Sequence, residues 1–257
     1  MIDGGARGAA FALRASGPLR GAARAAVARA CTPEALRSLR ACAPVFAAAA
    51  LAAFALKAFY ARASAEQLRF VLAPTAALVE GLTGVRFEAE PGAGYLSRER
   101  AYLIAPACAG LNYALAAFAT LVLGFGARFP RARTAWLLAS AVIAFAATLL
   151  VNAARIALDL ALPAAALPAW LPRAQAHRLE GVALYLGSLW LLHAGVERCF
   201  AQRGPRWRAA LLPLGAYLTV VLLLPALNGA TARPEFWAHA RVVLASALSL
   251  GAALVVA

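Results

Sequence analysis

Long apolar runs recur along this 257-residue chain and constrain its fold more than any other feature. A helix that crosses a bilayer needs about 20 predominantly apolar residues. The runs cover residues 44–60, 101–127, 134–154, 181–196, 209–232 and 242–257. They predict an all-α fold, a multi-span integral membrane helical bundle with about six spans.

The segment 66–84 departs from this pattern, because its apolar centre, 70–79, is only ten residues long and contains Pro74. We expect an interfacial or re-entrant helix there, and a further span is left open. Residues 85–100 predict a short extramembrane loop with the character of a hairpin. The turn residues of this loop are Pro91, Gly92 and Gly94.

The composition is that of a membrane protein, with 63% hydrophobic residues, 14% charged residues and a mean hydropathy of +0.73. The net charge of +14 comes almost entirely from arginine, and Lys57, near the end of the first run, is the only lysine. No basic patch interleaved with aromatic residues is present, so we expect no nucleic-acid partner. We divide the chain into a basic Ala/Gly/Arg-rich tail, 1–43, and a membrane-embedded domain, 44–257. The tail could be a surface helix or lack structure.

Arginine-rich segments predict the orientation, because loops that stay in the cytoplasm carry an excess of Lys and Arg. The three such segments are 1–43, 126–133 and 197–208. With these in the cytoplasm, the segments 61–104, 158–176 and 228–239 lie outside. Cys108, Arg155 and His177 then fall at the outer ends of three different spans, at one membrane depth.

Each of these three side chains has a functional and a structural interpretation. Cys108 follows Pro106 where a span is expected to begin, and a helix N-terminus favours the reactive thiolate; a small, inert, buried cysteine is the alternative. Arg155 could be a fixed cation for an anionic or carbonyl oxygen, or an interfacial side chain. It shares a helix face with Asn152 and Asp159.

His177 opens the next span, with Glu180 one turn later as a possible orienting partner. Alone it would be an interfacial residue, but beside a thiol it becomes a candidate for proton transfer. His193 lies sixteen residues further on and faces another direction, which disfavours a site built from both histidines. The chain has no CxxC or HExxH pattern. We therefore expect no metal site and no cofactor, and no role for Cys199 or His239.

Three short motifs resemble those of the exosortase/archaeosortase family of membrane cysteine transpeptidases. They are CAGLNY from Cys108, NAAR ending at Arg155, and HRLEG from His177, in that order on successive spans. The form PACAGLN is most similar to the exosortase K type. The resemblance covers roughly residues 44–200, and Ala109 stands where many members of the family carry serine.

The resemblance implies cleavage of C-terminal sorting signals, PEP-CTERM-like, on exported proteins at the outer face of the bacterial plasma membrane. Such a signal consists of a short motif, an apolar helix and a basic tail. Cys108 would be the nucleophile, His177 the general acid and base, and Arg155 the group that stabilises the oxyanion or positions the substrate. Asn152, Asn112 and Glu180 would support them.

Two other classes of function compete with this one. The alternative is a non-enzymatic multi-span transporter or assembly subunit, in which Arg155 balances the charge of a substrate and Cys108 is filler. A quinone-coupled thiol oxidoreductase would need a second cysteine on the same side, and Cys108 has no such partner in the predicted topology.

Overall fold

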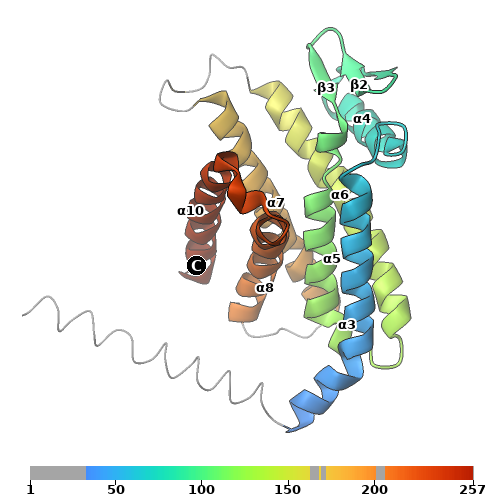
Figure 1. Ribbon diagram of the computed structural model, residues 1–257, viewed down its shortest axis with the longest axis vertical. Coiled ribbons are helices and arrows are strands. Elements are labelled where there is room, and N and C mark those ends of the chain that lie inside the picture. The colour runs from blue at the N-terminus through green and yellow to red at the C-terminus, as the bar shows by residue number, and fades with distance from the viewer. Residues whose placement is uncertain (1–32, 163–167, 169–171, 201–205, 257) are drawn as a thin grey trace, which may run out of the picture. The chain divides into compact units, whose positions relative to one another are not determined.

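The structure, a computed structural model, describes residues 33–162, 168, 172–200 and 206–256 (Figure 1). The chain divides into two compact units, Met1–Ala49 and Ala50–Ala257. The helices are α3 (Pro33–Tyr60), α4 (Arg69–Thr83), α5 (Leu111–Phe125), α6 (Arg133–Ala161), α7 (Arg173–Cys199), α8 (Arg206–Leu218), α9 (Leu224–Leu227) and α10 (Pro234–Val256). The strands are β1 (Glu88–Glu90), β2 (Gly94–Ser97) and β3 (Tyr102–Ile104). The interpretation of the tail falls largely on residues outside the described ranges.

Four helical segments are long and apolar enough to cross a membrane, in the part of the chain that is described. They are Pro106–Arg128, Arg133–Ala161, Gln175–Cys199 and Ala209–Leu227. The predicted helical membrane bundle is confirmed to this extent. The other two expected spans fall in α3, whose apolar part Ala47–Tyr60 is shorter, and in α10. A count of six therefore stays a prediction.

Helix α4 and the sheet form a small layer near the C-terminal end of α6 (Figure 1). At fifteen residues α4 is about 22 Å long, which is shorter than the hydrocarbon core of a bilayer. The predicted hairpin is present as β1 and β2, and β3 adds a third antiparallel strand. Gly94 permits this pairing, since a Cβ at that position would lie 2.3 Å from the carbonyl oxygen of Ile104.

Three apolar clusters are present among the described residues, and two of them are large. The larger core joins α5, α7, α8 and α10 and includes Tyr113, Leu186 and Val243. The second joins α4 and the sheet to the last turns of α6 through Leu72, Ile104 and Ile156. The polar groups described next lie where the start of α5, the end of α6 and the start of α7 come together.

Candidate active site

The turn that carries Cys108 precedes α5 and is not part of it. Residues Pro106–Cys108 form a single 3-10 turn, in which the N–H of Cys108 donates to the carbonyl of Ala105 at 2.8 Å. A candidate span does begin at Pro106, as expected, but its α-helical part begins only at Leu111, because Gly110 has a left-handed backbone (φ 70°). The thiol is half-buried in this turn.

Gly110 is required for two separate reasons. Its positive φ is unfavourable for a residue with a Cβ. A Cβ there would also lie 3.0 Å from Cγ2 of Thr148 and 3.3 Å from Cγ of Asn152. The missing side chain therefore lets the cysteine turn approach α6 directly.

Asn152 holds the cysteine turn against two helices. Its side chain is fully buried, and its Nδ2 donates to the carbonyl oxygen of Cys108. Its Oδ1 accepts a hydrogen bond from the hydroxyl of Tyr185 on α7 at 3.1 Å. Both sides of one buried amide are thus used to fix Cys108 relative to α6 and α7. The sequence had placed Asn152 only as a supporting residue beside Arg155.

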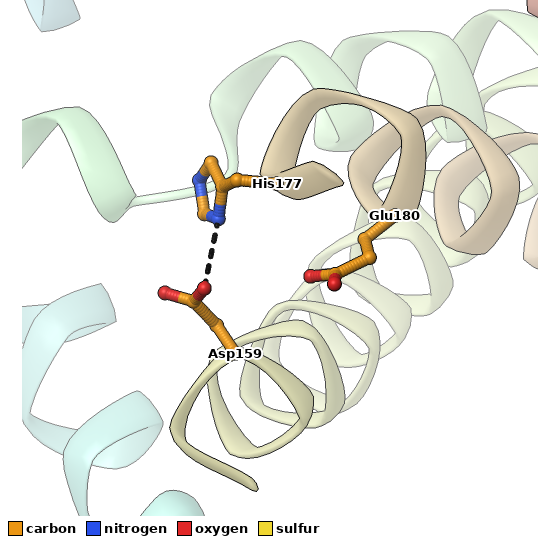
Figure 2. Close-up of side chains that lie close together, drawn as sticks. All are labelled: Asp159, His177 and Glu180. Atoms are coloured by element: carbon orange, nitrogen blue, oxygen red, sulfur yellow. Dashed lines mark ion pairs between the residues drawn. The ribbon is translucent and has the colours of Figure 1, made fainter. Parts of the chain in front are cut away.

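Arg155, His177 and Asp159 form a continuous polar chain. Nη1 of Arg155 lies 3.1 Å from Nε2 of His177. On the other side of the ring, Nδ1 of His177 lies 3.4 Å from Oδ1 of Asp159, the pair joined by the dashed line in Figure 2. The guanidinium of Arg155 also lies over the ring of Tyr185, with Cζ 5.7 Å from the ring centroid. The predicted approach of Arg155 and His177 is therefore present in the structure.

This arrangement assigns the tautomer of His177. A guanidinium has only donors, so Nε2 of His177 must accept the hydrogen bond from Arg155. The ring proton then resides on Nδ1, which faces the carboxylate of Asp159. In this state the imidazole is neutral, and the lone pair that could act as a base is occupied by Arg155.

Glu180 lies beside this chain but is not the ion-pair partner of His177. Asp159, His177 and Glu180 converge with their ligand atoms within 4.8 Å of one another, as Figure 2 shows. A group of one imidazole and two carboxylates can hold a divalent cation. A cation bound at Nδ1 would require the proton to move to Nε2, where it would meet the Arg155 donor. The geometry favours a proton at Nδ1 over a metal ion.

Two tyrosines near the cysteine were not identified from the sequence. Tyr185 bonds Asn152, and Tyr102 on β3 lies within electrostatic range of Asp159, Cys108 and Arg155. Burial, followed by the charges of Asp159 and of ionised Cys108, raises the pKa of Tyr102, and Arg155 opposes them. Tyr102 therefore stays a neutral donor at ordinary pH.

The thiol of Cys108 and the imidazole of His177, both described residues, are not joined by a hydrogen bond. Arg155 contacts His177 and also lines a cavity of about 350 Å³ beside the cysteine turn. Described residues that line the cavity are Lys57, Tyr60, Ala61, Pro106, Ala107, Ala109, Gly110, Leu111, Asn112, Arg155 and Tyr185. Asn112, the third supporting residue expected, is therefore at this cavity, where its Oδ1 accepts from Nζ of Lys57 at 3.5 Å.

The remaining histidine and cysteine of α7 lie far from this group. His193 is sixteen residues after His177, which is about 24 Å along a helix. It is buried, with its ring centroid 5.0 Å from that of Phe125. Cys199 is exposed at the end of α7. His177 and His193 are therefore separated along α7 by more than one site can span.

The candidate site therefore consists of a positioned thiol, an Arg–His–Asp chain and an adjoining cavity, brought together from the ends of three helices. These groups are the kinds that nucleophilic and acid–base chemistry uses. No family model, no curated protein and no solved structure matches this chain.

Proposed function

We propose that this chain is a membrane cysteine endopeptidase and transpeptidase that cleaves C-terminal sorting signals of exported proteins at the outer face of the plasma membrane. The observation that carries the proposal is the contact of Arg155 with His177 at the same end of the bundle as Cys108. Asn152 joins the two parts, since it holds the cysteine carbonyl one turn before Arg155 on α6.

The placement of charge supports an outward-facing site. The first candidate span runs from Pro106 to Arg128, so Cys108 and the arginine-rich loop lie at opposite ends of one segment. His177 and Arg198 are similarly separated along α7. By the positive-inside rule, the ends with Arg128 and Arg198 face the cytoplasm and the site faces outward.

The first chemical step is attack of the Cys108 sulfur on the substrate carbonyl. Arg155 leaves Nε2 of His177 and donates to the developing oxyanion, which frees the imidazole lone pair for the thiol proton. Collapse of the intermediate breaks the C–N bond, and His177 passes that proton to the departing amine. A thioester between the substrate and Cys108 remains.

In the second step an acceptor, either water or an amine, attacks the thioester carbonyl. His177 takes the proton of the acceptor and returns it to the sulfur of Cys108, so the enzyme is regenerated. Asp159 holds the Nδ1 proton throughout and stabilises the imidazolium when it forms. Loss of an oxyanion donor such as Arg155 typically costs about 10²–10³ in rate.

The substrate that fits is an exported protein with a C-terminal apolar helix and a basic tail. The helix would lie in the bilayer beside the bundle, with its basic end in the cytoplasm. Its motif would then reach the outer interface, at the depth of Cys108. The cavity beside the cysteine turn is of a size that can accept part of such a segment.

Processing of a reporter in intact cells tests this proposal. A secreted reporter with a Pro-containing motif, an apolar helix and a basic tail is co-expressed with the full chain, and its C-terminal fragment is followed by immunoblot. We expect cleavage with the wild type and with Cys199→Ala, the matched control, and none with Cys108→Ala. Efficient cleavage by Cys108→Ala, or full function of Cys108→Ser, would instead favour a non-enzymatic membrane protein.

A further inference from the structure

The cavity beside the cysteine turn has a strongly one-sided charge. Lys57 and Arg155 line it, and no aspartate or glutamate does so among the described residues. Its volume of about 350 Å³ is that of a small ligand site. The cavity also adjoins the backbone of the cysteine turn through Pro106 and Gly110.

A π-helical turn that follows α8 leaves one carbonyl without a helical donor, and this carbonyl holds Lys57 at the cavity. Residues Thr219–Leu223 form a π-helical turn, in which the N–H of Leu224 donates to the carbonyl of Thr219, five residues back. The next residue, Pro225, has no N–H, so the carbonyl of Val220 loses the equivalent donor. Nζ of Lys57 donates to that carbonyl at 3.1 Å.

Both hydrogen bonds that Lys57 makes to described residues go to neutral acceptors. Its second contact is the amide oxygen of Asn112 at 3.5 Å. No carboxylate lies within ion-pair distance of Lys57 in the part of the chain that the structure describes. An ammonium group has three donors, so one remains for a ligand. Lys57 is thus fixed in place and available, instead of extending freely to the membrane surface.

The first turn of α5 adds to the same positive potential. Gly110, Leu111 and Asn112 all line the cavity, and Gly110 offers no side chain to cap the helix. The N–H groups of Leu111 and Asn112 have no backbone acceptor among the described residues. A helix N-terminus favours anions. Here it coincides with two fixed cations, which makes the cavity electrostatically suited to a negative group.

We propose that this cavity is a binding site for an oxyanion group, a carboxylate or a phosphate, and that Lys57 determines its selectivity. The inference goes beyond the proposed function, because it concerns binding and holds whether or not Cys108 performs chemistry. A bound oxyanion also attracts Arg155, whose Nη1 otherwise donates a hydrogen bond to Nε2 of His177. Occupation of the cavity thereby favours release of the imidazole lone pair.

Two binding assays on full-length Cys108→Ala protein distinguish a peptide carboxylate from a lipid phosphate as the source of the oxyanion. In phosphatidylcholine nanodiscs, calorimetry compares N-acetyl-Gly-Glu-Gly-amide with its Gln counterpart. In detergent, native mass spectrometry compares retention of phosphatidylglycerol with that of phosphatidylcholine. We expect a preference for the anionic probe of at least about tenfold in one assay, which is what one charge-assisted hydrogen bond provides.

Substitutions at Lys57 decide the result. Lys57→Met should abolish the anion preference, Lys57→Arg should retain it, and Arg98→Met should leave it unchanged. Arg98 is the matched control, because its guanidinium pairs with Glu88 and Glu90 on the sheet, away from the cavity. The peptide assay supports a carboxylate ligand and the lipid assay a phosphate ligand. Absence of any anion preference in both assays, or a preference that survives Lys57→Met, would overturn the proposal.

Discussion

Replacing Asn152 with alanine tests whether one buried amide positions the nucleophile. The substitution removes the donor to the Cys108 carbonyl and the acceptor of the Tyr185 hydroxyl. Each buried polar group that loses its partner costs about 1–3 kcal/mol. Two such groups give a loss of about 2–4 kcal/mol, after partial relaxation, in the free energy of unfolding. The midpoint of thermal unfolding in detergent should fall by about 4–16 °C.

The activity of Asn152→Ala should fall by more than its loss of folding stability alone would cause. Without Asn152 the cysteine turn loses its side-chain hydrogen bond to α6. A displacement of about 1 Å of a reacting group can cost about 10²-fold in rate. We therefore expect reporter processing to drop about 100-fold at temperatures where the variant is still folded.

Two conservative variants separate the hydrogen bonds of Asn152. Asn152→Asp keeps an acceptor for Tyr185 but removes the donor to Cys108, so it should lose activity as the alanine variant does. Tyr185→Phe removes only the other bond and should lose much less, since Nδ2 of Asn152 still reaches Cys108. Full processing by Asn152→Asp in folded protein would refute the reasoning.

The remaining predictions concern Asp159, Gly110 and Tyr102. Asp159→Asn should reduce kcat about 10²-fold with KM nearly unchanged, because it removes the carboxylate that favours the Nδ1 tautomer of His177 and does not line the cavity. An equal loss of kcat in Glu180→Gln would contradict this. Gly110→Ala should lower expression and thermal stability, measured by fluorescence-detected size exclusion, because its Cβ would meet α6. The raised pKa of Tyr102 means that its contribution to stability is full below pH 10 and is lost at higher pH. Wild-type protein should accordingly lose more thermal stability than Tyr102→Phe from about pH 9 to about pH 11.

The spans could be predicted because a membrane helix is a local property of sequence. An uncharged run indicates both the length of the helix and its location in the bilayer. Four of the expected runs correspond to helices of sufficient length. Boundaries were less predictable. The candidate span begins at Pro106 as predicted, but the sequence did not indicate that its first turn is 3-10 and that the α-helix starts after a left-handed Gly110, which lies against Thr148 and Asn152 of α6.

The contact between Arg155 and His177 was predictable because ionisable residues are rare at membrane depth. Ionisable residues are costly at membrane depth, so each one that occurs near a span end carries information. The choice of partner for His177 was not predictable in the same way. Glu180 was favoured because it lies one turn away on the same helix, whereas the ion pair is made with Asp159 across the α6–α7 contact.

Tyr102 and Lys57 show which information the sequence did not contain. Tyr102 reaches the site only because β3 completes a sheet whose third strand was not expected. The sequence shows only that Lys57 lies near the end of an apolar run, whereas in the structure a carbonyl left without a donor by Pro225 holds it at the cavity. Both placements depend on contacts between segments far apart in the chain.

Isolation of the acyl-enzyme tests directly whether Cys108 is a nucleophile. Purified full-length protein is incubated with the reporter, trapped with acid, digested and examined by mass spectrometry for a peptide joined to Cys108. We expect a hydroxylamine-sensitive thioester on Cys108 that accumulates in the wild type and is absent from Cys108→Ala. Reporter cleavage without any adduct on Cys108, or an adduct found on Cys199 instead, would contradict it.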